Sequence, residues 1–145
     1  MTAAVTWGII SAAFTPAGGS VFNISDCTEI SFKDSIDLQN LLTDAHVNVN
    51  LVFGTGGVTE FSLKSTDTSL AWGSTVKPGV EGSLVLVFGK RAAGKGYVSG
   101  QNKTMTASNA VIGERNGGAS PAQAGSSDWS FRAYDPAGTG IFAVA

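Results

Sequence analysis

The chain has 145 residues, of which 43% are apolar and 14% are charged, and its formal net charge is −2. This length fits one domain with a sizeable core. The single cysteine, Cys27, excludes a disulfide framework within the chain, and no apolar run approaches the ~18 residues of a membrane span.

The scarcity of charge is the most informative feature of the composition. Soluble chains carry about 25% charged residues, and here glycine and small polar residues take their place. A surface with so little charge favours burial against neighbouring copies of the chain. The alternative is an extracellular or phage-type β-protein whose exposed surface is rich in Ser and Thr.

The charges that are present are divided unevenly along the chain. Residues 1–67 contain seven acids and two bases, a net of −5, and residues 68–145 contain four acids and seven bases, a net of +3. If the halves form different faces, an acidic face of one copy can meet a basic face of the next. Such a head-to-tail contact is heterologous.

The N-terminal part combines an arm and paired strands. Residues 1–19 are rich in alanine and have no basic residue ahead of the apolar stretch, which argues against a secretory signal and favours synthesis in the cytoplasm. They are interpreted as an N-terminal arm. Residues 20–25 and 27–36 alternate apolar and polar positions, as half-buried strands do.

The middle of the chain predicts a hairpin. Residues 36–45 place Leu38, Leu41 and Leu42 near helical spacing, yet they also fit an extended arm between strands. The run 46–53 alternates again, GTGG at 54–57 is predicted to be the turn, and 58–66 is the returning strand.

The second half adds one short helix and several strands. Residues 67–74 predict a helix that begins with Asp67 as its N-cap and ends at Gly73. The continuously apolar run 83–90 is typical of a central strand, and residues 113–127 are expected to be a flexible loop. Further strands are predicted within 95–115, 127–135 and 139–145.

These elements together predict an all-β fold. Residues 1–145 form a single β domain, a small β-sandwich or barrel of about eight strands with one short helix and an extended arm or loop.

One segment resembles a phosphate-binding loop. Residues 89–96, GKRAAGKG, match its first seven positions and follow an apolar strand. The next residue must be Ser or Thr but is Gly96, and the following residues predict a strand where the motif needs a helix. The segment is therefore interpreted as a basic hairpin loop.

The histidine, cysteine and acidic residues are too few or too scattered to form a catalytic or metal-binding site. His46 is the only histidine, and neither a metal cluster nor a Cys–His pair is supported. The acidic residues from Asp26 to Asp37 occupy both even and odd positions of the predicted strand, so their side chains do not share one face. We therefore predict no catalytic residues, no metal, no cofactor and no enzymatic activity.

Two kinds of binding surface stay open. The bases Lys90, Arg91, Lys95 and Lys103 could border a nucleic-acid path, although few aromatic residues lie among them. The three tryptophans are the reason to retain a carbohydrate-binding module as an alternative, because such modules use exposed aromatic platforms. Core or interface packing is the alternative interpretation. The tryptophans are Trp7, Trp72 and Trp129.

The order of the features resembles the tail tube proteins of long-tailed bacteriophages and the related tubes of injection machines. The resemblance covers roughly residues 20–145. It lies in the strands ending at 27–36, the segment 36–45, the hairpin 47–66, the helix signal at 67–74, and the later segments 83–90 and 109–142.

The resemblance implies a subunit of hexameric rings that stack into a hollow tube for DNA. It implies assembly contacts through Leu38, Leu41 and Leu42, and location in the virion tail. The implied partners are other copies, tail proteins such as the tape measure and the terminator, and DNA passing without sequence recognition. No membrane is implied. The alternative is a capsid decoration or carbohydrate- or surface-binding β-module.

Overall fold

The protein folds as one antiparallel sheet. The structure, a computed structural model, describes residues 6–24, 26–41, 48, 51–67, 70, 73, 76–91, 96–136 and 140–145. These residues form eight strands and contain no α-helix. The all-β prediction is therefore confirmed.

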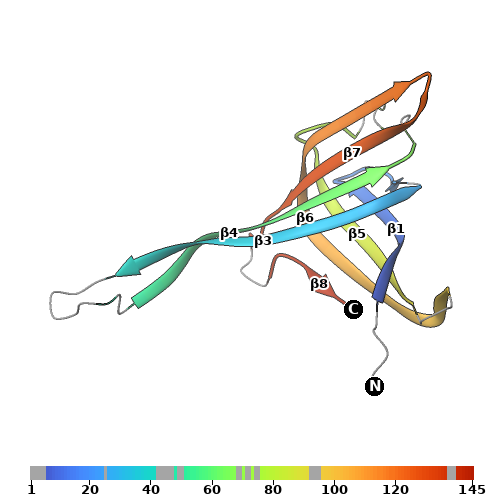
Figure 1. Cartoon of the computed structure of the whole chain (residues 1–145). Coiled ribbons are helices and arrows are strands. Elements are labelled where there is room, and N and C mark those ends of the chain that lie inside the picture. Colours follow the sequence, from blue (N-terminus) through green and yellow to red (C-terminus); the bar gives the residue numbers. More distant parts are fainter. Residues whose placement is uncertain are drawn as a thin grey trace.

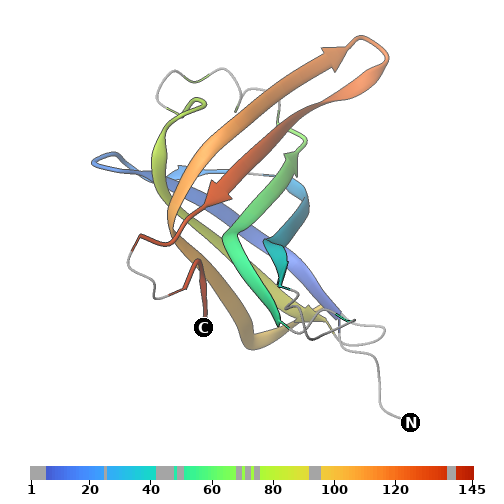
Figure 2. The same cartoon turned by 90° about the vertical axis from the view of Figure 1, so that its left-hand side faces the viewer.

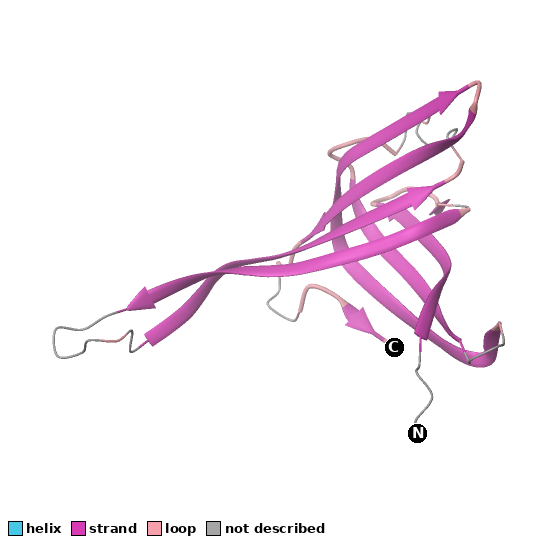
Figure 3. Ribbon diagram, viewed as in Figure 1, coloured by secondary structure: helices cyan, strands magenta, loops and turns pink. Residues whose placement is uncertain are grey.

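The strands follow the order β2-β1-β5-β6-β7-β4-β3 across the sheet, and β8 pairs with β6 beside this path. β5 lies inside the sheet, as the apolar run 83–90 predicted. In Figures 1 and 3 the sheet is strongly curved, and the β3–β4 hairpin projects from the body. The bounds are β1 Thr6–Pro16, β2 Phe22–Asn23, β3 Cys27–Leu41, β4 Leu51–Ser65, β5 Glu81–Arg91, β6 Tyr97–Ser120, β7 Gln123–Ala133 and β8 Ala143–Val144.

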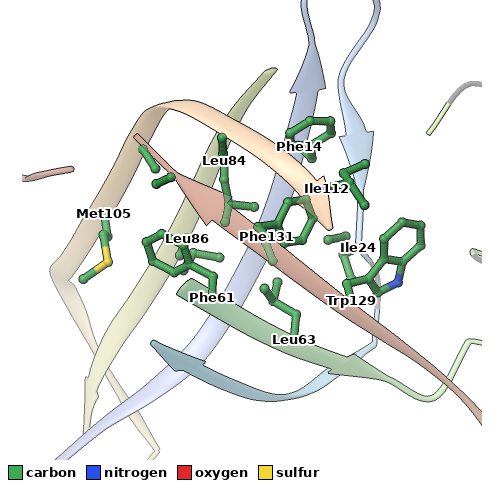
Figure 4. Packing of buried hydrophobic residues seen from close by; sticks show 14 of the residues in the cluster. Phe14, Ile24, Phe61, Leu63, Leu84, Leu86, Met105, Ile112, Trp129 and Phe131 are labelled. Atoms are coloured by element: carbon green, nitrogen blue, oxygen red, sulfur yellow. The ribbon is translucent and has the colours of Figure 1, made fainter. Parts of the chain in front are cut away.

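Figure 2 shows the curvature of the sheet, and the core side chains drawn in Figure 4 pack together on its concave side. Alternate residues of each strand point to the same face, so Leu84 and Leu86 of β5 and Phe61 and Leu63 of β4 all point inward and are buried. Trp129 of β7 lies in the same cluster. Strands distant in sequence therefore share one apolar core.

Two segments have a structure that differs from the expected one. Residues 6–16 of the expected N-terminal arm form β1, which pairs with β5 and buries Phe14 in the core. Residues 113–127, expected to be a flexible loop, belong to the ends of β6 and β7 and the turn at 121–122. Backbone pairing between β6 and β7 holds this hairpin together. Its residues lack the alternation of apolar and polar positions from which a strand is predicted.

The short helix predicted over 67–74 is not seen. The structure describes only Asp67, Leu70 and Gly73 of that segment, and the Leu70 amide donates to the Asp67 carbonyl oxygen at 3.4 Å. The Asp67 amide donates to Ser65 Oγ, and Ser127 Oγ donates to the Asp67 carbonyl oxygen. The expected N-cap is thus held by the neighbouring strands.

The prediction that GTGG forms the hairpin turn is also wrong. Residues 54–57 lie inside β4, opposite β3, and the connection between the two strands falls within 42–50. The register shifts between Ser35 and Asp37, where Gly56 has a φ of 65°. Glycine tolerates this left-handed backbone, so the segment forms a β-bulge.

Gly82 provides a test of the packing between β1 and β5. A Cβ atom there would lie 2.8 Å from Phe14 Cζ and 2.9 Å from Pro16 Cα. We expect Gly82→Ala to lower the free energy of unfolding by about 1–3 kcal/mol, measured by urea denaturation. Gly118→Ala is the control, because no atom lies within 4 Å of its Cβ position; an equal loss in both variants would contradict the packing argument.

Candidate assembly interface

The distal half of the β3–β4 hairpin stands apart from the rest of the sheet. We call residues 36–41 and 51–57 the arm (Figure 1). The ladder between β4 and β7 starts at Thr59, so in the described part of the chain the arm strands pair only with each other. The arm is therefore a two-stranded ribbon with no third strand beside it.

Both faces of this ribbon are apolar. Residues paired directly across antiparallel strands point to the same side. Leu41 pairs with Leu51 and Gln39 pairs with Phe53, so one face carries three large apolar side chains.

The opposite face also carries three apolar side chains. Leu38 pairs with Gly54, and Val52 pairs with Asn40. The side chain of Ile36 fills the space that a Cβ atom at Gly54 would take, which places Ile36 on the same face.

These six side chains are exposed in the single chain. Their exposed fractions run from 45% at Leu41 to 64% at Leu38. Burying such a side chain fully is worth about 1.5–3 kcal/mol, so covering the exposed half of each gains roughly 1 kcal/mol. A two-stranded hairpin is at best marginally stable alone in water. The arm thus has the properties of a surface that a partner covers on both sides.

The base of the arm is tied to the body. Thr59 is buried, and its hydroxyl donates to the carboxylate of Asp34 across the strand pair. The ring of Phe142 packs edge-on against Phe32 and Phe61, with centroids 6.0 Å and 6.4 Å apart. These contacts fix the direction in which the arm leaves the sheet.

β3 also provides a free strand edge. It is the last strand in the sheet order, and among the residues that the structure describes it pairs with β4 alone. A long unpaired edge is a template for another strand. Along the arm, the apolar side chains and this backbone edge form one continuous surface.

Two of the three predicted assembly residues lie in the part of the chain that the structure describes. Leu38 and Leu41 lie in the arm on opposite faces, and Leu42 lies outside the described residues. Sequence reasoning missed Leu51, Val52 and Phe53, because the glycines that follow them predicted a turn.

Other residues singled out from the sequence lie apart from the arm. Trp129 is buried, and Trp7 is 41% exposed near the start of β1. Lys90 and Arg91 end β5, and Lys103 lies opposite Phe88 on β6. His46, Trp72 and Lys95 lie outside the described residues.

Cys27 does not have the features of an activated nucleophile. Burial raises the pKa of its thiol above the ordinary value, and hydrogen bonds to the backbone of Glu29 and Lys64 lower it by a smaller amount. Reactive cysteines instead have lowered pKa values. Among the described residues, no group of three or more His, Cys, Asp or Glu side chains is placed to hold a metal ion.

We expect Cys27 to react slowly with iodoacetamide at pH 8, since a raised pKa leaves less thiolate at that pH. Val21→Cys in a Cys27→Ser background is the reference, because Val21 is 60% exposed. The two alkylation rates are compared by mass spectrometry in the native state and again in urea, where they should converge. A native Cys27 that reacts faster than the reference would contradict the raised pKa.

No helix in the described part of the chain is long and apolar enough to cross a membrane. The sequence matches no protein-family model and no curated protein.

Proposed function

We propose that the protein is a structural subunit of a phage tail, which assembles into stacked rings that form a hollow tube for DNA. One observation carries the proposal: a two-stranded arm leaves the sheet with large apolar side chains exposed on both faces. A free monomer would leave this surface in water, whereas a neighbouring copy would cover it.

The form of the contact supports a polymer rather than a closed dimer. The arm leaves one edge of the sheet, and in this proposal the surface that receives it lies elsewhere on the molecule. Such a heterologous contact repeats from copy to copy and gives rings or filaments. In this proposal the curved sheet is barrel-like and forms the wall of the tube, and other tail proteins cap its ends.

Negative-stain microscopy of concentrated purified protein tests the proposal. The expected result is rings or tubes, together with sedimentation that becomes faster as the protein concentration rises. Compact monomers or trimers at every concentration would overturn it and favour the second candidate below.

The second candidate is a capsid decoration or carbohydrate-binding module. It is favoured by the exposure of Trp7 and Tyr97, which are 41% and 43% exposed. Exposed aromatic faces can stack on sugar rings. This candidate predicts binding to glycans without assembly, so the same microscopy experiment separates the two.

A further inference from the structure

A second apolar surface lies at the open end of the core. It is a cavity of about 270 Å³. Phe88 and Met105 are its less exposed walls, while Trp7, Phe32 and Val144 are 41–53% exposed. The residues come from five strands, and Lys103 also lines the cavity.

The cavity continues the apolar core towards solvent. Leu84 and Leu86 of β5 are buried, and Phe88 follows them on the same face of the strand. Met105 pairs with both Leu86 and Val144, so β8 borders the cavity at the point where the sheet core ends. The cavity is thus an unfilled extension of the core.

The arm of the same chain cannot fill it. Phe32 lines the cavity, and Leu41 lies nine residues further along the same continuous strand. Nine residues of strand span about 30 Å. The tip of the arm is therefore held away from its own cavity, so an arm that enters the cavity must belong to another copy.

The charges around the two surfaces are opposite. The ammonium group of Lys103 lies 5.2 Å from the ring centroid of Trp7, and Lys90 pairs with Trp7 on the neighbouring strand. The arm carries one charged residue, Asp37, and the acid Asp34 lies at its base next to Lys33. A basic border on the cavity and an acid on the arm favour this pairing over a contact between two identical surfaces.

The sizes of the two surfaces also agree. An apolar cavity of about 150 Å³ can hold a benzene molecule, so the present cavity has room for the ring of Phe53. Leu41 and Leu51 lie on the same face of the arm as Phe53 and can cover the exposed rim formed by Trp7 and Val144.

We propose that the arm of one copy inserts Phe53, with Leu41 and Leu51, into the cavity bordered by Trp7, Phe88 and Val144 of a second copy. This inference rests on the proposed function and specifies the contact that links one copy to the next. Because arm and cavity are different surfaces, two linked copies together still offer one free arm and one free cavity.

Complementation between two defective variants tests the contact. The arm variant is Leu41→Asp with Phe53→Asp, and the cavity variant is Val144→Asp. Val21→Asp is the control, because Val21 is 60% exposed and lies beyond the opposite end of β1 from Trp7. All proteins are studied by sedimentation velocity, alone and as a 1:1 mixture of the arm and cavity variants.

The expected result is that the wild type and Val21→Asp polymerise, while each defective variant associates roughly 30-fold or more weakly. The mixture should give a complex of one copy of each, linked by the intact arm and the intact cavity, that does not grow further. A cavity variant that polymerises like the wild type, or a mixture whose components stay separate, overturns the inference alone. A wild type that stays a single chain overturns the proposed function as well.

Discussion

Phe61→Ala is expected to lower the free energy of unfolding by about 3–5 kcal/mol, whereas Phe53→Ala leaves it within about 0.5 kcal/mol and abolishes assembly. Both residues lie on β4, eight positions apart, and the two substitutions remove the same atoms. Only the surroundings of the two rings differ.

The surroundings of Phe61 are those of a core residue. Its side chain has no exposed surface, and its ring contacts Phe32 and Phe142 at centroid distances of 6.3 Å and 6.4 Å. Truncation leaves a cavity among groups that cannot collapse fully into it, which adds to the lost transfer free energy. The loss should appear in urea denaturation at any protein concentration.

Phe53 has none of this support. Its ring is 47% exposed in the single chain, and its strand pairs there with β3 alone. Its truncation should therefore leave the urea midpoint of the dilute monomer unchanged while sedimentation loses the polymer. A Phe53→Ala protein that unfolds as easily as Phe61→Ala would show that the arm packs against its own body.

The contrast between these two phenylalanines shows what the sequence could predict. Both occur in runs that alternate apolar and polar residues, and the alternation correctly predicted β-structure for 58–66 and for the residues just before Gly54. Alternation defines two faces of a strand but does not say whether anything covers them. Coverage depends on β7, which pairs with β4 only from Thr59 onwards.

The glycines at 54–57 explain why the turn was misplaced. A Gly-rich segment between two apolar runs predicts a turn and equally a bulge, because both need backbone conformations that glycine permits. The long-range register decides between them, and here Ser35 pairs with Val58 while Asp37 pairs with Thr55. The assembly residues predicted from the sequence, Leu38 and Leu41, therefore belong to only one of the two strands of the arm, β3.

The cavity could not be predicted from the sequence at all. Trp7, Phe32, Phe88, Met105 and Val144 come from five strands and follow no shared spacing along the chain. Each fits an ordinary strand pattern on its own. Only the order of the strands in the sheet brings them together.

Excision of the arm should separate folding from assembly most completely. The change replaces residues 38–54 with Asn-Gly, which favours the tight type I′ turn of a two-residue hairpin, between Asp37 and Thr55, which already pair. No residue of the described core cluster is removed. We expect the free energy of unfolding to stay within about 1 kcal/mol or to rise slightly, because a shorter connection costs less loop-closure entropy.

The same excision removes five of the six exposed apolar side chains of the arm and leaves only Ile36, so the protein should sediment as a single chain at every concentration. The β6–β7 hairpin provides the control: replacing residues 119–125 with Asn-Gly between Gly118 and Ser126, which also pair, shortens an exposed hairpin without touching the arm. That variant should fold and assemble as the wild type does. If the arm-less protein still forms polymers, the arm is not the contact between copies. If it fails to fold, the five removed side chains stabilise the fold of the single chain itself.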